Sequence, residues 1–267
     1  MSGGHDFLMF SLMAAALVAI FGPILLITLW RMRTRQPLKP VLIGMLTFFV
    51  SAMVLENIPH VYFMKINTVT ANFLTSNMLA YAAYGGIMAG LFEEMGRFVA
   101  FHFVGLARQG KRTAISYGIG HGGIECMLVA GLSYIANFVL YTAYRANMLA
   151  GMLPEEQMTQ IVEGLKTLEP ETICLGVFER FSALILQVAL SYIVYKAVKE
   201  KKKYLLVVAI LLHAGVDFGV VALAGSGISI VVLEFIIFAY CFMVAMVAFR
   251  CYKKDDGFSS VGEIPHL

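Results

Sequence analysis

The stretch LFEEMGRFVAF, residues 91–101, carries Glu93, Glu94 and Arg97 within a run that otherwise has the composition of a membrane-spanning helix. An unpaired ionised side chain at the centre of a bilayer costs about 2.5 to 3.5 kcal/mol even on lenient insertion scales. Arg97 lies four residues after Glu93 and three after Glu94, so it can reach at least one carboxylate on its own helix. A structural ion pair would need only one glutamate. The second carboxylate has no cation on this helix and is free to take a proton.

The rest of the chain has the composition of an integral membrane protein. Of its 267 residues, 60% are hydrophobic and only 14% are charged, far from the usage of soluble domains. We predict an all-α, polytopic membrane bundle of about seven transmembrane helices that forms a single transmembrane domain over residues 1–267. The predicted crossings are residues 7–30, 41–58, 78–106, 113–142, 173–195, 204–224 and 228–249.

Basic residues predict the orientation of this bundle. They cluster after the first, third, fifth and seventh predicted crossings, whereas the opposite side holds only Lys65, Arg145 and Lys166. The positive-inside rule then places the N-terminus outside the cell and the C-terminus in the cytoplasm. We expect the bundle to lie in a bacterial cell membrane. We expect an amphipathic outer loop at about residues 143–172 and a short, loose cytoplasmic tail at residues 250–267. Glu179 and Arg180, in the fifth crossing, are expected to pair with different neighbours because their side chains point about 100° apart.

Two further crossings each carry a histidine and a carboxylate four residues apart. His121 and Glu125 lie in the fourth crossing, and His213 and Asp217 lie in the sixth. This spacing places each pair on one helical face. Both histidines are about nine residues from the predicted cytoplasmic end of their helices, about 13 Å at 1.5 Å per residue. We therefore expect the pairs to meet the diglutamate in a cavity in the cytoplasmic half of the bilayer.

Two kinds of chemistry fit such a cavity. In one, Glu93 or Glu94 acts as a general base on a water molecule while a histidine stabilises the oxyanion. In the other, a divalent metal such as zinc is bound by candidate ligands His121, Glu125, His213 and Asp217. The expected partners are membrane lipids and a membrane protein or peptide substrate. The composition shows no nucleic-acid motif and no CxxC metal site, and the sequence makes no prediction about the oligomeric state.

The motifs FEEMGR, YGIGHGGIE and HAGVD, which begin at residues 92, 117 and 213, resemble those of the membrane-embedded CAAX protease and bacteriocin-processing superfamily. They are similar to its YhfC branch of intramembrane metalloproteases, related to the PrsW group and to the APH-1 subunit of gamma-secretase. The resemblance covers a catalytic-like core at about residues 78–224 and implies a cytosol-facing active site. It makes Glu93 the water-activating residue, supported by Glu94 and Arg97. His121 is then the first histidine, and His213 with Asp217 forms the last motif.

Two departures separate this chain from the CAAX proteases. It has EExxR where they have EExxxR, so the resemblance leaves the choice of base between Glu93 and Glu94 open. It also has Asp217 where they have asparagine, which favours a metal site. The resulting hypothesis is an intramembrane endopeptidase. A non-catalytic scaffold or binding subunit of the same fold is the main alternative, and a proton-coupled transporter is the second.

Overall fold

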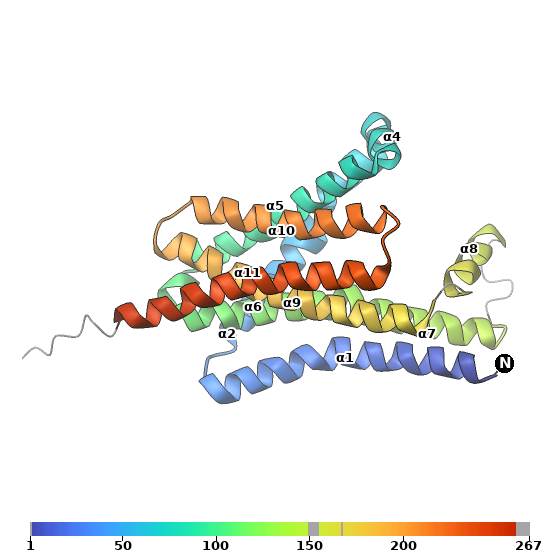
Figure 1. Ribbon diagram of the computed structural model, residues 1–267, viewed down its shortest axis with the longest axis horizontal. Coiled ribbons are helices and arrows are strands. Elements are labelled where there is room, and N and C mark those ends of the chain that lie inside the picture. The colour runs from blue at the N-terminus through green and yellow to red at the C-terminus, as the bar shows by residue number, and fades with distance from the viewer. Residues whose placement is uncertain (1, 149–154, 167, 260–267) are drawn as a thin grey trace, which may run out of the picture.

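The computed structural model describes residues 2–148, 155–166 and 168–259, and these residues form helices without any β-strand. The long helices run roughly side by side along one axis, with the α4 and α8 regions at one end of the bundle (Figure 1). The predicted all-α bundle is confirmed. Residues 149–154, in the predicted outer loop, and residues 260–267, in the predicted tail, lie outside the described part of the chain.

Six helical segments within the described residues are long and apolar enough to cross a membrane. They are α1 (Ser2–Thr34); the continuous run of α2 (Lys39–Phe48), η1 (Phe49–Leu55), α3 (Asn57–Val61) and η2 (Tyr62–Ile66); the run of α6 (Lys111–Glu125), η4 (Cys126–Gly131) and α7 (Leu132–Arg145); α9 (Pro170–Lys199); α10 (Tyr204–Ala224); and α11 (Ile230–Ser259).

Helix α5 (Met78–His102) is the segment that carries Glu93, Glu94 and Arg97. It has 25 residues, about 37 Å of helix, which is enough to span the hydrocarbon core. Its three charged residues set it apart from the six apolar spans, yet all three are buried inside the bundle. The remaining described elements are short: α4 (Thr68–Ser76), η3 (Leu106–Gln109) and α8 (Glu155–Lys166).

Glycines let two helix pairs approach closely at the level of the charged residues. A Cβ atom built on Gly86 of α5 would lie 2.4 Å from the carbonyl oxygen of Ala214 on α10. One built on Gly120 of α6 would lie 2.1 Å from the carbonyl oxygen of Val41 on α2. Any larger residue would push these backbones apart. The contacts therefore hold α5 against α10, and α6 against α2, at the distance that the buried polar groups need.

The C-terminal helix continues further than the sequence indicates. Helix α11 runs on to Ser259, so the expectation of a loose tail from residue 250 onward is wrong for the first part of that segment. Lys111 donates a hydrogen bond to the carbonyl oxygen of Tyr252 at 2.8 Å. Asp255 accepts from the hydroxyl of Tyr192 and from Lys196, whose Nζ lies 3.1 Å away. These contacts give the last turns of α11 partners on α6 and α9.

The amphipathic segment at the opposite end contains the expected helix. Helix α8 covers Glu155–Lys166, and its apolar side packs on the bundle. Leu165 is buried there in a cluster with Leu8, Leu12 and Tyr141. Its predicted position at the outer membrane surface stays a prediction.

Candidate functional site

Helix α5 brings three charged side chains into the interior. Glu94 and Arg97 are fully buried, and Glu93 is 6% exposed. Nη1 of Arg97 lies 3.5 Å from Oε2 of Glu94. The single arginine of this helix therefore pairs with Glu94, and Glu93 has to find its partners on other helices.

His121 of α6 is one of those partners. Its Nε2 lies 2.8 Å from Oε2 of Glu93, and its ring is completely buried. The Phe48 ring on α2 lies nearly perpendicular to the imidazole and the Tyr117 ring is stacked on it, with centroid distances of 5.4 and 5.8 Å. Its Nδ1 makes no hydrogen bond with the described residues. This packing fixes the ring orientation that the contact with Glu93 requires.

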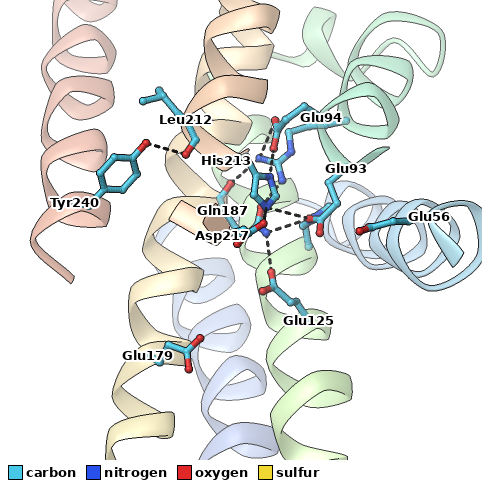
Figure 2. A network of polar contacts seen from close by, with 12 residues as sticks. Glu56, Glu93, Glu94, Glu125, Glu179, Gln187, Leu212, His213, Asp217 and Tyr240 are labelled. Atoms are coloured by element: carbon cyan, nitrogen blue, oxygen red, sulfur yellow. Dashed lines mark hydrogen bonds and ion pairs between the residues drawn. The ribbon is translucent and has the colours of Figure 1, made fainter. Parts of the chain in front are cut away.

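His213 of α10 pairs with the second glutamate (Figure 2). Its Nδ1 lies 2.8 Å from Oε1 of Glu94, so it donates there and Nε2 becomes the free nitrogen of a neutral ring. That Nε2 faces two carboxylates, with Oδ2 of Asp217 at 3.7 Å and Oε2 of Glu93 at 4.0 Å. Both distances exceed a hydrogen bond. A lone pair and two carboxylates that converge in this way need a positive charge between them, either a second proton on the ring or a metal ion.

Gln187 of α9 links the two halves of this network, and the sequence analysis missed it. Its Nε2 lies 3.1 Å from Oε2 of Glu93 and 2.7 Å from Oε2 of Glu125. Arg97 donates to its side-chain oxygen and, at 3.2 Å, to its backbone carbonyl. A neutral amide within an apolar run attracts little notice in a search for charges. The position of this polar residue in the middle of a membrane span was the feature of the sequence that could have identified it as a site residue.

Arg180 of α9 extends the network beyond Glu125. Its Nη1 lies 3.3 Å from Oε1 of Glu125, and its Nη2 contacts the carboxylate of Glu179. The expectation that Glu179 and Arg180 pair with different neighbours is therefore wrong. The long arginine side chain bends back to its own neighbour, which the angle between two Cα–Cβ bonds does not reveal.

The seven residues singled out in the sequence lie in this one network, which receives side chains from α5, α6, α9 and α10 (Figure 2). A cavity of about 90 Å³ borders it and is lined by Glu125, Gln187, His213 and Asp217, among others. The convergence of the residues agrees with the sequence analysis. Their chemical roles stay predictions.

The donor atoms around His213 are of the chemical types that bind a divalent cation. Zinc binds imidazole nitrogen and carboxylate oxygen at about 2.0 to 2.2 Å, so tetrahedral ligands are about 3.4 Å apart. The contacts of 3.7 and 4.0 Å from Nε2 of His213 to Asp217 and Glu93 are near that spacing. Glu94 holds the other ring nitrogen, as carboxylates often do for metal-bound histidines. Among the described residues, however, no three His, Cys, Asp or Glu side chains are already grouped closely enough to hold a metal.

Two of the four candidate ligands have other contacts in this structure. Both oxygens of Glu125 accept from cationic or amide donors, Arg180 and Gln187. Nε2 of His121 is engaged with Glu93. His213 and Asp217 are thus the better placed ligands of the predicted set.

Comparison with known proteins identifies the family of the chain. The model of the family described as YhfC intramembrane metalloprotease matches residues 15–237, which include the whole polar network. The chain is also 36% identical over 201 residues to a protein of Bacillus subtilis (strain 168) named uncharacterized membrane protein YhfC, and the match covers 74% of this chain and 78% of that protein. No solved structure matches. The chain is a multi-pass membrane protein and belongs to the YhfC intramembrane metalloprotease family.

Proposed function

We propose that this protein is an intramembrane endopeptidase that hydrolyses a peptide bond of a membrane-associated protein or peptide, with Glu93 as the general base. One observation carries the proposal: Oε2 of Glu93 is the atom on which His121, Gln187 and His213 converge, at 2.8, 3.1 and 4.0 Å. A carboxylate placed among polar groups from three other helices, next to two residues that line a cavity, Gln187 and His213, has the surroundings that a water-activating base requires.

The contacts support Glu93 rather than Glu94 as the base. Glu94 is fully buried and is held by Arg97 on one oxygen and by His213 on the other. Its role is to position the imidazole of His213. Among the described residues Glu93 makes no ion pair with an arginine, and it lies 4.0 Å from Nε2 of His213, a residue that lines the cavity. In this scheme Glu93 takes a proton from the attacking water and returns it to the amine that leaves.

The imidazoles supply the complementary charge. The substrate carbonyl gains negative charge as water attacks, and an N–H donor aimed at it stabilises the transition state. His213 reaches the cavity and serves as this donor when both ring nitrogens are protonated. Gln187 is a positioning residue, since its amide holds Glu93 and Glu125 at a fixed separation.

A metal ion, as the family name implies, would be held by His213 and Asp217, with Glu93 beside it as the base. It would polarise the carbonyl and lower the pKa of a bound water. Metal analysis of the purified protein tests this without any cleavage assay. We expect about one divalent ion per chain, lost in the double variant His213→Ala, Asp217→Ala and retained in Glu234→Gln. Glu234 is a matched control because it is a buried carboxylate on α11 that is not among the residues in contact with Glu93, His213 or Asp217.

The proposed cleavage is tested without knowledge of the substrate. Bacterial membranes are incubated with purified protein in detergent, and new protein N-termini are captured and identified by mass spectrometry. We expect a set of new N-termini that disappears with Glu93→Gln and with His121→Ala and persists with Glu234→Gln. Thermal melting of each variant checks that it is folded. If the parent and folded Glu93→Gln samples produce the same N-termini, the proposal is wrong and the scaffold alternative gains support.

A further inference from the structure

A second, larger cavity adjoins the one beside His213. It has a volume of about 420 Å³ and is lined by His60, Tyr84, Glu179, Asp217 and Val220, among others. The smaller cavity shares three of these residues with it, Glu179, Asp217 and Val220. The two spaces are therefore neighbours that share a wall at Asp217, and His213 lines the inner one. We call the larger space the vestibule.

The vestibule lies at the α4 end of the bundle. His60 belongs to α3, close to the end of its membrane span, and Tyr84 lies in the second turn of α5. Val220 and Val221 lie in the last turns of α10. The loops that join these elements are at the same end as α4 and α8 (Figure 1).

The opposite approach to the network is filled by aromatic side chains. Phe101, Tyr117 and Tyr195 are all fully buried there. The ring of Phe101 packs on Tyr117 with 4.9 Å between centroids and on Tyr195 with 6.2 Å. Arg97, one turn before Phe101, is also fully buried. Among the described residues this layer separates the network from the end of the bundle that carries the basic loops.

Acidic groups line both spaces. The side chains of Asp217 and Glu179, which line the vestibule, are 38% and 27% exposed, and Glu56 lies 3.2 Å from His60 of the wall. Arg180 is the basic residue among those lining the inner cavity, and it already contacts Glu125 and Glu179. Asp217 adds a further carboxylate, whose Oδ2 lies 3.7 Å from Nε2 of His213. At the inner end, His213 is 4% exposed and its Nε2 has no hydrogen-bond partner closer than the two carboxylates described above.

We propose that the substrate enters from the α4 and α8 end, through the vestibule, as an extended peptide segment with a basic side chain that is bound by Glu179, and also by Asp217 when Asp217 holds no metal ion. The substrate part of this inference rests on the proposed function, whereas the entrance can be tested without cleavage. By the distribution of basic residues, this end faces the outside of the cell. The inferred route is thus opposite to the cytosol-facing site that the family resemblance implies.

Cysteine labelling tests the entrance. Val220→Cys is introduced after Cys126 and Cys241, both buried, are replaced by alanine. The native Cys174, exposed at the start of α9, and Cys251, near the other end of the bundle, remain as reporters of the two sides. Intact cells are treated with membrane-impermeant methanethiosulfonate reagents, one cationic and one anionic, and each site is read by peptide mass spectrometry. Membranes opened by sonication expose both sides.

We expect Val220→Cys to be modified whenever Cys174 is, and Ala100→Cys, in the buried layer, to stay unmodified. Relative to Cys174, the cationic reagent should react about tenfold faster than the anionic one, since one carboxylate a few ångströms away favours one sign and repels the other. Asp217→Asn should remove most of this preference.

Modification of Val220→Cys only from the side of Cys251, or from neither side, would overturn the entrance. If the variant does not fold, Tyr84→Cys gives the same test from the vestibule wall. Equal rates for both reagents would overturn the preference for a basic side chain. None of these readings depends on proteolysis, so a protein that labels as expected and cleaves nothing would refute the proposed function alone.

Discussion

Replacement of Gln187 by methionine tests whether the buried network stabilises the bundle. Methionine has a similar length and no strong hydrogen-bonding group. The change removes the amide that donates to Glu93 and to Glu125, and the oxygen that accepts from Arg97. Three contacts to charged groups disappear at one buried position, while the backbone carbonyl of residue 187 can still accept from Arg97.

The expected loss follows from these three contacts. Hydrogen bonds to charged groups contribute about 1.5 to 3 kcal/mol each in soluble proteins. Side-chain hydrogen bonds between membrane helices average only about 0.6 kcal/mol. The sum therefore lies between about 2 and about 9 kcal/mol, and the shared network makes simple addition too large. Because Arg97 keeps one acceptor at 3.2 Å, we expect the free energy of unfolding to fall by about 3 to 4 kcal/mol.

The assay is reversible unfolding in mixed micelles with increasing dodecyl sulfate, followed by circular dichroism. Gln109→Met is the control, because Gln109 is exposed at the end of η3 and should change stability by less than about 0.5 kcal/mol. A loss below about 1 kcal/mol for Gln187→Met would refute the reasoning, since the network would then contribute no more than an ordinary surface contact.

Two further predictions concern packing and topology. Gly120→Ala should lower the free energy of unfolding by about 2 kcal/mol or more, because the new Cβ would lie 2.1 Å from the Val41 carbonyl oxygen. Gly22→Ala is the control in the same unfolding assay, because a Cβ at Gly22 would have nothing within 4 Å. Equal losses of stability for the two variants would contradict the close contact at Gly120. In intact cells an impermeant thiol reagent should modify Cys174 and spare Cys251 until the membrane is opened; the reverse pattern would contradict the orientation inferred from the basic residues.

Much of the fold could be predicted because the bilayer restricts it so strongly. A chain in lipid must satisfy its backbone hydrogen bonds within each segment, so long apolar runs become helices. Most predicted ends agree with the observed helices within a few residues. The second crossing is longer than expected, since helical structure continues from residue 58 to Ile66. The prediction missed this extension because polar residues such as His60 and Lys65 interrupt the apolar run. Hydropathy indicates which residues lie in lipid, not where a helix ends.

Only part of the site could be predicted from the sequence. Spacing of four residues placed His121 with Glu125 and His213 with Asp217 on common faces, but it could not show that each histidine would choose a different glutamate of the pair on α5. That choice depends on how the helices are rotated about their axes, which the close glycine contacts fix. Gln187 was not predicted as a site residue because it is uncharged.

The central claim is that water, activated at Glu93, hydrolyses a peptide bond inside this bundle. The most direct measurement is a digestion of bacterial membranes by the purified protein in water enriched with oxygen-18, followed by mass analysis of the new C-terminal peptides. The account predicts that these peptides carry one heavy oxygen with the parent protein and are missing with folded Glu93→Gln. New C-termini without the heavy oxygen, or the same labelled peptides from both proteins, would contradict it.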